Sequence, residues 1–250
     1  INEPVLVDLI NSKPLQRLKG ISQLGMPQEY YHKPIFSRDE HSIGVLILLK
    51  KLNADLDEQV AGLIHDISHT AFSHVVDWVI GDSTKEDYQD NVFLNFLENS
   101  EIPHILGKYG VDLKNFSNLE NFSLLEKEAP SLCADRFDYS IREINWNDSK
   151  LVKIIVNDLK NYKGNLFFNS KNVAESFANG YVNCQVEHWA GDEAKVRYYI
   201  LARVLRKAIS DEIISVKNLN EIEDEQIINL LREKGGKYIL DNLDLLRNGF

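Results

Sequence analysis

The sequence has few cysteines and no long apolar run, and both absences narrow its class. Only two of the 250 residues are cysteine, Cys133 and Cys184. A disulfide-stabilised scaffold is therefore excluded, and the low count fits a reducing cytosol, so we expect a cytoplasmic protein. The longest strictly apolar run in the first half, Val45 to Leu49, is far shorter than the ~20 residues of a membrane span. The chain does not open with a basic and then apolar leader, so we expect neither a signal peptide nor a membrane partner.

Positive charge is also scarce relative to negative charge. The chain has 28 Lys and Arg against 38 Asp and Glu, a net charge of −10, so strong binding to duplex nucleic acid is not expected. A metal and a few local cations could still bind a phosphate. The 44% hydrophobic and 26% charged residues are typical of a globular protein. We predict a core over residues 1–150 and, packed on it, a hairpin and C-terminal helical lobe over residues 151–250.

The spacing of apolar residues predicts a mostly α-helical chain. One helix should begin with Asp39 as its N-cap, and the acidic cluster Glu221 to Glu225 is read as another helix start. Short β-branched or aromatic segments, Leu151 to Val156 and Gly164 to Phe168, predict a β-hairpin. The polar residues 107–123 should form a surface loop. Further helices are expected near residues 14–21, 60–65, 75–80, 88–97, 134–144, 173–189 and 193–209.

The densest group of reactive side chains lies in residues 61–74, AGLIHDISHTAFSH. His65, Asp66, His69 and His74 fall within ten residues, at the end of the apolar run Val60 to Ile64. Imidazole gives a neutral nitrogen donor and carboxylate a charged oxygen, which together suit a divalent cation. The alternative is that these polar residues only cap a buried helix.

A second candidate element is the helix predicted over residues 134–144. Asp135, Tyr139 and Arg142 fall at positions i, i+4 and i+7 and so share one face. This polar face is either part of a functional site or the solvated face of a surface helix. Metal sites of this kind are assembled from neighbouring helices, and His41 at a helix start, the His65-Asp66 pair and Asp135 would supply two imidazoles and two carboxylates.

Four segments carry a resemblance to a known family. They are PLQRLKGISQLG at 14–25, SRDEHSIGV at 37–45, AGLIHDISHTAFSH at 61–74 and ADRFDYSIRE at 134–143. In this order they resemble the HD superfamily of metal-dependent phosphohydrolases. More narrowly they resemble the deoxynucleoside triphosphate triphosphohydrolase branch, which includes the sterile-alpha-motif-and-HD-domain enzyme and its bacterial relatives. The resemblance implies an HD-domain helical bundle with a small β-hairpin and a C-terminal helical lobe.

The resemblance also implies a role for individual residues. It implies a divalent metal ion (Mn, Fe, Ni, Zn, Co or Mg), a nucleotide substrate cleaved to deoxynucleoside and triphosphate, and assembly into a homo-oligomer. The implied metal ligands are His41, His65, Asp66 and Asp135. The implied catalytic residues are His69, His74 and Asp66, with Asp138 as a weaker candidate for a supporting partner. The implied substrate contacts are Gln23 and Leu24 along sugar and base, Arg38 and Arg136 on phosphate, and Tyr139 on the sugar.

The sequence departs from the family pattern in places that bear on the substrate. Ser68 stands where the family usually has Gly, and Thr70-Ala71 stands where the family usually has Gly-Pro. A further family histidine has no counterpart between Lys85 and Tyr88. Two alternatives therefore stay open: a nucleotidase or phosphodiesterase acting on another phosphate ester, and a nucleotide-sensing module with low turnover.

Overall fold

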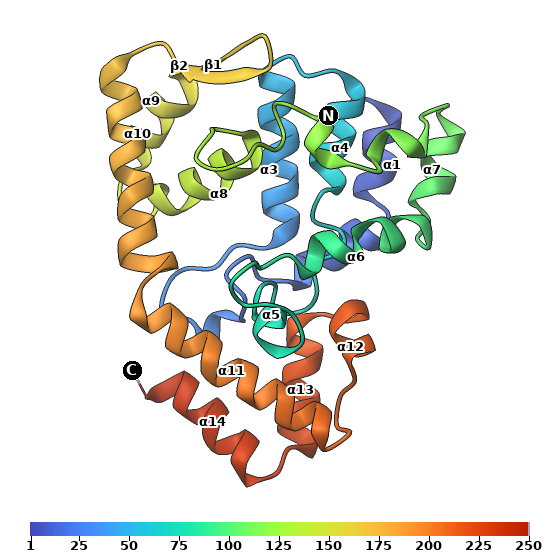
Figure 1. The fold of residues 1–250 in the computed structure, drawn as a ribbon, viewed down its shortest axis with the longest axis vertical. Helices are drawn as coiled ribbons and strands as arrows, with labels where there is room; N and C mark the ends of the chain where they lie inside the picture. Colours follow the sequence, from blue (N-terminus) through green and yellow to red (C-terminus); the bar gives the residue numbers. More distant parts are fainter. Residues whose placement is uncertain (250) are drawn as a thin grey trace.

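The computed structural model describes residues 1–249 and shows a helical protein (Figure 1). The strands within this range form one antiparallel hairpin, which confirms the mostly α-helical prediction. No helix in the described range combines the length and the apolar character needed to cross a bilayer.

The upper part of the molecule in Figure 1 is built around α3 (Arg38–Lys51), which packs against α4 (Leu56–Ile64) and α8 (Ala134–Asn145). Apolar side chains of these three helices share one core with the N-terminal helices, the hairpin and Phe177. The surrounding helices are α1 (Pro4–Ile10), α2 (Lys13–Arg17), α6 (Tyr88–Glu98), α7 (Ile102–Lys108), α9 (Ser149–Asp158) and α10 (Lys171–Cys184), whereas α5 (Val75–Val79) belongs to the lower part of the molecule. Short 3₁₀ turns cover Leu18–Gly20, Gln28–Tyr30, Leu113–Phe116 and Leu119–Asn121.

The start of α3 differs from the prediction, because its N-cap is Ser37 and not Asp39. The Ser37 hydroxyl accepts the Glu40 N–H at 3.1 Å, and the Glu40 carboxylate accepts the Ser37 N–H at 2.8 Å. This reciprocal pair satisfies two backbone donors, which Asp39 alone would not do. Arg38 thereby becomes the first helical residue, and His41 follows one turn later.

The hairpin is present, but its first strand was predicted too early. Residues 149–158 form α9, and the strands are β1 (Leu159–Tyr162) and β2 (Asn165–Phe168), paired with Leu159 opposite Phe168. The Asp148 side chain accepts the N–H groups of Lys150 and Leu151, so it caps α9 and favours a helix over the β-branched run that follows.

The lower part of the molecule in Figure 1 has its own apolar core around the long helix α11 (Asp192–Ser210). This core includes residues from two upstream segments, 24–36 and 71–76, so the C-terminal helices hold loops that lead to the site. A π-helical turn, Gln185–Trp189, joins α10 to α11, which confirms the two long helices predicted over 173–189 and 193–209. The remaining helices are α12 (Val216–Glu221), α13 (Asp224–Lys234) and α14 (Lys237–Asn248).

Candidate metal centre

The four implied metal ligands come together where α3, α4 and α8 meet. His41 Nε2 lies 2.8 Å from Asp135 Oδ1 and 3.3 Å from His65 Nε2. His65 Nε2 lies 3.4 Å from Asp66 Oδ1 and 3.5 Å from Asp135 Oδ1. His41, His65 and Asp66 are buried, and one ligand atom of each lies within 4.8 Å of the others. A single small cation could therefore contact His41, His65 and Asp66, and Asp135 lies against both histidines beside it.

Both histidine rings are held with Nε2 toward this cluster. The Nδ1 atom of His65 donates to the Gly62 carbonyl at 2.8 Å, which leaves a lone pair on Nε2. The Nδ1 atom of His41 lies 2.8 Å from Asp138 Oδ2. A carboxylate on the outer nitrogen of a histidine is the usual partner of a metal ligand, because it fixes the ring and raises its basicity. Asp138, a weak candidate from sequence, is thus the side chain that orients His41.

The charges of the cluster balance each other. Burial opposes a charge on His41, but hydrogen bonds with Asp135 and Asp138 outweigh it and raise its pKa to about 10. Burial also opposes a charge on Asp135, but its bonds with His41 and His65 hold its pKa well below the usual range. In the metal-free protein the positive charge on His41 thus offsets the negative charge of Asp135. Two imidazoles and two carboxylates suit a divalent cation in the same place.

Arg38 connects this cluster to a neighbouring loop. Its guanidinium is buried, donating from Nη1 to Asp66 Oδ2 at 2.6 Å and from Nε to Ser73 Oγ at 2.7 Å. Its Nη2 atom is buried without a hydrogen-bond partner. Leaving a buried donor of a cation without an acceptor costs free energy. The Nη2 group of Arg38 is therefore available to bind an anion.

His69 and His74 lie beside the cluster, with their rings 5.0 Å apart. His69 Nε2 is 3.3 Å from Asp66 Oδ1, and burial together with the nearby Arg38 charge holds the pKa of His69 well below its usual value. His69 is therefore neutral at physiological pH. His74 Nδ1 lies 3.4 Å from Asp77 Oδ2, so this ring is oriented by a carboxylate.

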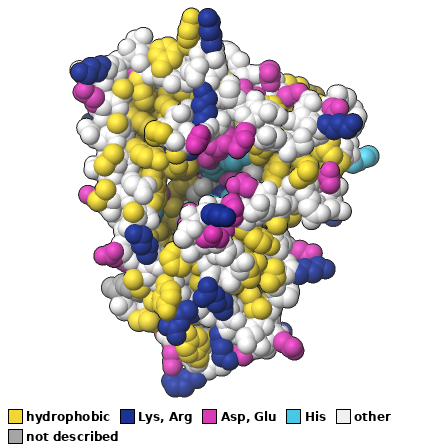
Figure 2. Space-filling view, viewed as in Figure 1, with side chains coloured by type: hydrophobic (Ala, Val, Ile, Leu, Met, Phe, Trp, Pro, Cys, Tyr) yellow, Lys and Arg dark blue, Asp and Glu magenta, His cyan; other side chains and the backbone are white. Residues whose placement is uncertain are grey.

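A cavity of about 610 Å³ opens above the cluster. Figure 2 shows a hollow near the centre of this face, with acidic and histidine side chains at its edge. Five of the residues implied by the resemblance contribute to its wall: Gln23, Leu24, His74, Asp135 and Tyr139.

Arg136 lies outside this cavity wall. Its guanidinium donates to the Lys127 carbonyl at 3.3 Å and to the Ser131 carbonyl, and it lies three residues before Tyr139 on α8. Arg136 thus lies near Tyr139, but its guanidinium is hydrogen-bonded to backbone carbonyls.

The far wall of the cavity holds a buried polar chain, of which the sequence had suggested only His188, and that with a structural role favoured. The Tyr31 hydroxyl lies 2.7 Å from His188 Nε2, and His188 Nδ1 lies 2.6 Å from Glu143 Oε2. Trp189 Nε1 donates to the other Glu143 oxygen at 2.8 Å. Glu143 falls four residues after Tyr139 on α8, so helical spacing could have placed it on the same face.

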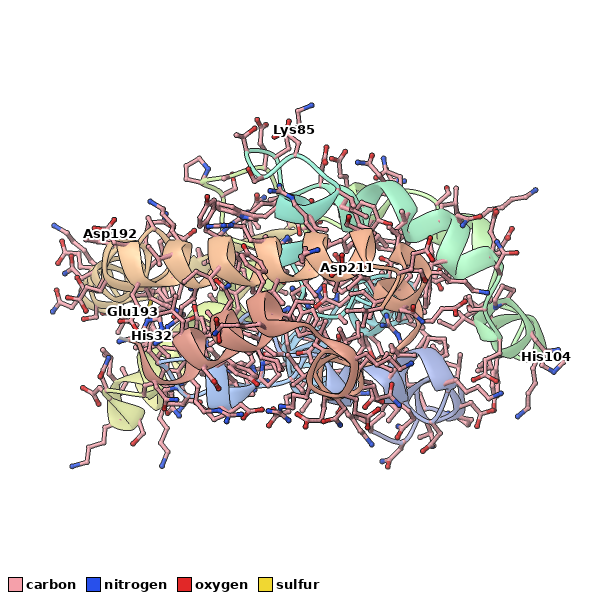
Figure 3. All side chains as sticks on the ribbon, turned by 90° about the horizontal axis from the view of Figure 1, so that it is seen from below. His32, Lys85, His104, Asp192, Glu193 and Asp211 are labelled. Carbon is pink, nitrogen blue, oxygen red and sulfur yellow. The ribbon has the colours of Figure 1, made fainter. Side chains whose placement is uncertain are left out.

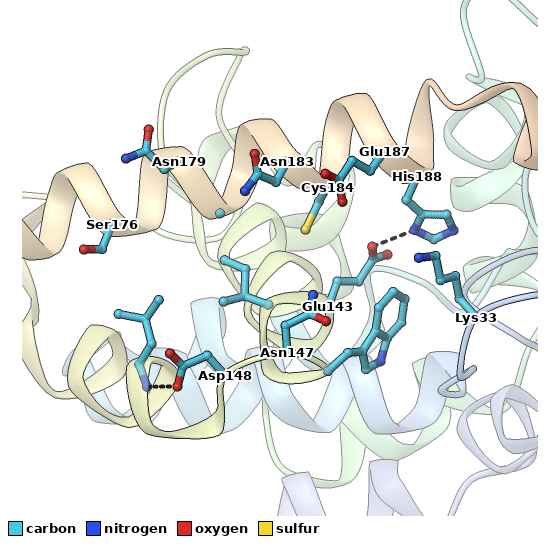
Figure 4. Close-up of a pocket in the computed structure, with 14 residues that line it drawn as sticks. Lys33, Glu143, Asn147, Asp148, Ser176, Asn179, Asn183, Cys184, Glu187 and His188 are labelled. Carbon is cyan, nitrogen blue, oxygen red and sulfur yellow. Dashed lines mark hydrogen bonds and ion pairs between the residues drawn. The ribbon is translucent and has the colours of Figure 1, made fainter.

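This polar chain also separates the main cavity from a smaller one of about 350 Å³. Figure 4 shows the smaller cavity, with the hydrogen bond between Glu143 and His188 at one end and the amides of α10 along its upper wall. Glu143 and His188 contribute to both cavities.

Two histidines that lie outside the four segments also lie away from the cluster. Figure 3 shows His104 at the outer edge of α7, where it is exposed. His32 lies in the loop after residue 30, with Nδ1 3.7 Å from Glu193 Oε1 (Figure 3).

Comparisons with known proteins agree with this geometry. The HD-domain family profile matches residues 38–127. The chain is 39% identical to the uncharacterized protein YdhJ of Bacillus subtilis over 98% of its length, covering 76% of that relative. It is 31% identical to the metal-dependent phosphohydrolase cns2 of Cordyceps militaris over 93% of its length, covering 70% of that relative.

Two further likenesses are more limited. A segment covering 30% of the chain is 35% identical to the deoxynucleoside triphosphate triphosphohydrolase SAMHD1 of Bos taurus, of which it covers 15%. The fold is also that of a crystal structure of a phosphohydrolase from Bacteroides thetaiotaomicron, with a TM-score of 0.73 at 19% identity over all of this chain and 73% of the other. The segments that form the cluster and the likeness over the whole chain together show that this protein belongs to the HD-domain family of metal-dependent phosphohydrolases.

Proposed function

We propose that the protein hydrolyses a phosphate ester of a nucleotide, with a divalent ion held by His41, His65, Asp66 and Asp135. The observation that carries this proposal is the convergence of these four side chains below a cavity large enough for a nucleotide. A divalent cation at this position would polarise the phosphoryl group and lower the pKa of water.

The neighbouring residues supply the remaining chemistry. Arg38, with a free buried donor, would bind a phosphate oxygen and offset the charge that develops on it. Neutral His69 would accept a proton from the attacking water. His74, oriented by Asp77 on the cavity wall, would return a proton to the leaving oxygen.

The leading substrate is a deoxynucleoside triphosphate, cleaved to deoxynucleoside and triphosphate. Gln23, Leu24 and Tyr139 line the cavity above the cluster, where a sugar and base would lie. Gln23 Oε1 is buried without a partner and would accept a hydrogen bond from such a ligand. The partial likeness to SAMHD1 gives this substrate additional support.

The second candidate is a nucleotide with fewer phosphates, and the charge of the cavity favours it. Lys195 is the one Lys or Arg among the described residues of the cavity wall, whereas Glu86, Asp135 and Glu143 are acidic. The Arg136 guanidinium is not on this wall and donates to the carbonyls of Lys127 and Ser131. A triphosphate has more negative charge to neutralise than a monophosphate, so a wall this poor in cations suits the smaller ligand better.

A panel of nucleotides separates these candidates. The purified protein is incubated with Mn²⁺, Mg²⁺, Co²⁺, Ni²⁺, Fe²⁺ or Zn²⁺ and with deoxynucleoside triphosphates, monophosphates or cyclic nucleotides. Release of nucleoside and intact triphosphate would support the leading substrate. Stepwise release of orthophosphate from triphosphates would rule it out, and orthophosphate from a monophosphate would support the second candidate. Binding of metal and nucleotide without hydrolysis would instead indicate a sensing module.

We also propose that the protein forms a homo-oligomer. Val182 and Val186 near the end of α10, and Tyr162 and Phe167 on the hairpin, are large apolar side chains that are exposed in the single chain. Burial of such residues is a common reason for self-association. Light scattering at micromolar concentration should give at least a dimeric mass, and a monomeric mass would contradict this expectation.

A further inference from the structure

The acidic turn at the start of α13 reaches toward the metal centre from the C-terminal helices. We propose that Asp224 is a positioning residue, which fixes the orientation of Asp66 through a chain of hydrogen bonds. The chain runs from Asp224 through Ser22, Ser73 and Arg38 to Asp66. This inference rests on the proposed function, since it concerns how a proposed metal ligand is held.

Asp224 is the anchor of the chain. Its side chain is buried, and each carboxylate oxygen accepts one backbone N–H: that of Ser22 at 2.9 Å and that of Phe72 at 2.7 Å. Hydrogen bonds to an ionised acceptor are stronger than those between neutral groups. One carboxylate thus joins two segments that lie far apart in the sequence and that both lead into the site.

The segment that Asp224 holds contains an unusual turn. Phe72 and Ser73 both have positive φ values, 64° and 47°, although neither is glycine. Each such residue costs about 1–3 kcal/mol and persists only where the surroundings fix it. Asp224 accepts the N–H of Phe72, and the Leu219 carbonyl accepts the N–H of Ala71 at 2.8 Å, so the C-terminal helices hold this turn from both sides.

The turn places the Ser73 hydroxyl between Ser22 and Arg38. Ser73 Oγ donates to the Ser22 carbonyl at 2.7 Å and accepts the Nε–H of Arg38 at 2.7 Å. The hydroxyl can donate only one proton, so its bond to Ser22 leaves its lone pairs facing Arg38. Ser22 is held by Asp224 and by its antiparallel bridge to Ser37, so Asp224 contributes to how Arg38 is held.

Arg38 then fixes the carboxylate of Asp66. Its Nη1 atom binds Asp66 Oδ2 at 2.6 Å, while Asp66 Oδ1 faces His65 Nε2 at 3.4 Å. A guanidinium that is held at Nε cannot rotate freely, so it fixes the plane of the carboxylate it binds. If the chain is broken at Asp224 or at Ser73, Asp66 should lose this orientation and the centre should bind metal more weakly.

Two variants and their combination test this chain. Asp224→Asn keeps the shape but replaces one acceptor oxygen with an NH₂ group, and Ser73→Ala removes the middle link. Asp158→Asn is the matched control, since Asp158 also accepts a backbone N–H, that of Ser170 at 2.8 Å, but lies beside the hairpin. Mn²⁺ affinity is measured by calorimetry at about pH 8, because burial raises the pKa of Asp224 to about 7.

Each single variant should weaken Mn²⁺ binding by about 10-fold, the usual effect of losing a residue that supports a ligand. The double variant should bind Mn²⁺ less than about twofold more weakly than the single variant that has the lower affinity, because both changes break the same chain. The control should bind Mn²⁺ like the unaltered protein. Losses that multiply in the double variant, or an unchanged affinity of Asp224→Asn, would overturn the proposal.

A second readout does not depend on metal. Proton exchange at Arg38 Nε–H, followed by nuclear magnetic resonance, should be slow in the unaltered protein and faster in both single variants. If the unaltered protein binds no Mn²⁺, the proposed function fails. The exchange measurement still tests the role of Asp224, because exchange at Arg38 that is the same in the variants as in the unaltered protein would overturn the proposal. Should Asp224→Asn not fold, Asp224→Glu moves the carboxylate by one methylene, and the same two changes are expected.

Discussion

The two ends of the main cavity hold buried polar groups in different ways. At the metal centre, charges are paired with one another: His41 lies against Asp135, and Arg38 against Asp66. At the far end, Glu143 is surrounded by the ring nitrogens of His188 and Trp189. Removal of one member of a charge pair leaves a buried charge without compensation, which is the costlier loss. The metal end should therefore govern metal binding and turnover, and the far end the binding of the substrate.

The largest expected effect is that of Asp135→Ala, which removes a proposed ligand. Metal affinity should fall by at least about 10-fold, more than the loss of a supporting residue typically costs. Turnover should fall by a larger factor, because the ion supplies both charge stabilisation and activation of water. Metal content and turnover after desalting check this. Full retention of both would show that the four residues do not form one site.

The second effect is the pH dependence of metal binding. His41 is protonated in the metal-free protein, since its bonds with Asp135 and Asp138 raise its pKa to about 10 despite burial. Metal must displace that proton, so affinity should rise with pH by up to about tenfold per unit between about pH 6 and 8. Calorimetry in buffers of different ionisation enthalpy measures the proton released. A pH-independent affinity would contradict the ligand role of His41.

The third effect is that of Asp138→Asn, which changes the group that orients His41. Asp138 Oδ2 lies 2.8 Å from His41 Nδ1 and accepts the Arg142 Nε–H at 2.6 Å. An amide is a weaker acceptor than a carboxylate, so metal affinity should fall by about 10-fold. Equilibrium dialysis with Mn²⁺ measures this change, with Asp158→Asn as the control. An affinity equal to that of the control would show that Asp138 does not support the metal ligand His41.

The smallest effect on metal is expected from Glu143→Gln, which tests the far end. The amide keeps one acceptor for Trp189 but no longer bears the charge that faces His188, at a cost of about 1–3 kcal/mol in stability. Metal affinity should stay unchanged while KM for the nucleotide rises. Thermal unfolding, metal titration and steady-state kinetics separate these quantities. Loss of metal with an unchanged KM would reverse the comparison between the two ends.

Local patterns in the sequence were sufficient to predict most helices, whereas the four proposed ligands were implied by the resemblance to the HD superfamily. The local patterns failed where two local signals competed. The β-branched run from Leu151 to Val156 favours a strand, but the cap at Asp148 and the burial of Ile155 make it a helix. At α3, the capping pair of Ser37 and Glu40 takes precedence over Asp39.

Long-range contacts could not be predicted in this way. The acidic cluster before α13 was correctly predicted to start a helix, yet its spacing gave no sign that Asp224 would accept the N–H groups of Ser22 and Phe72. His188 and Glu143 likewise come from separate helical segments. Such pairs depend on how the two cores pack together, which no periodicity within one segment encodes.

The most direct test of the proposed metal centre is the position of a bound ion. Crystals grown with Mn²⁺ are measured near the manganese absorption edge, and the anomalous difference map locates the metal. We predict one ion per chain within about 2.0–2.3 Å of its ligand atoms. Those ligands should belong to His41, His65, Asp66 and Asp135. An ion bound instead by Glu126, Cys133 and Asp135, the other group in the described residues with suitable donor atoms, would contradict the proposed ligand set, as would a chain that binds no ion.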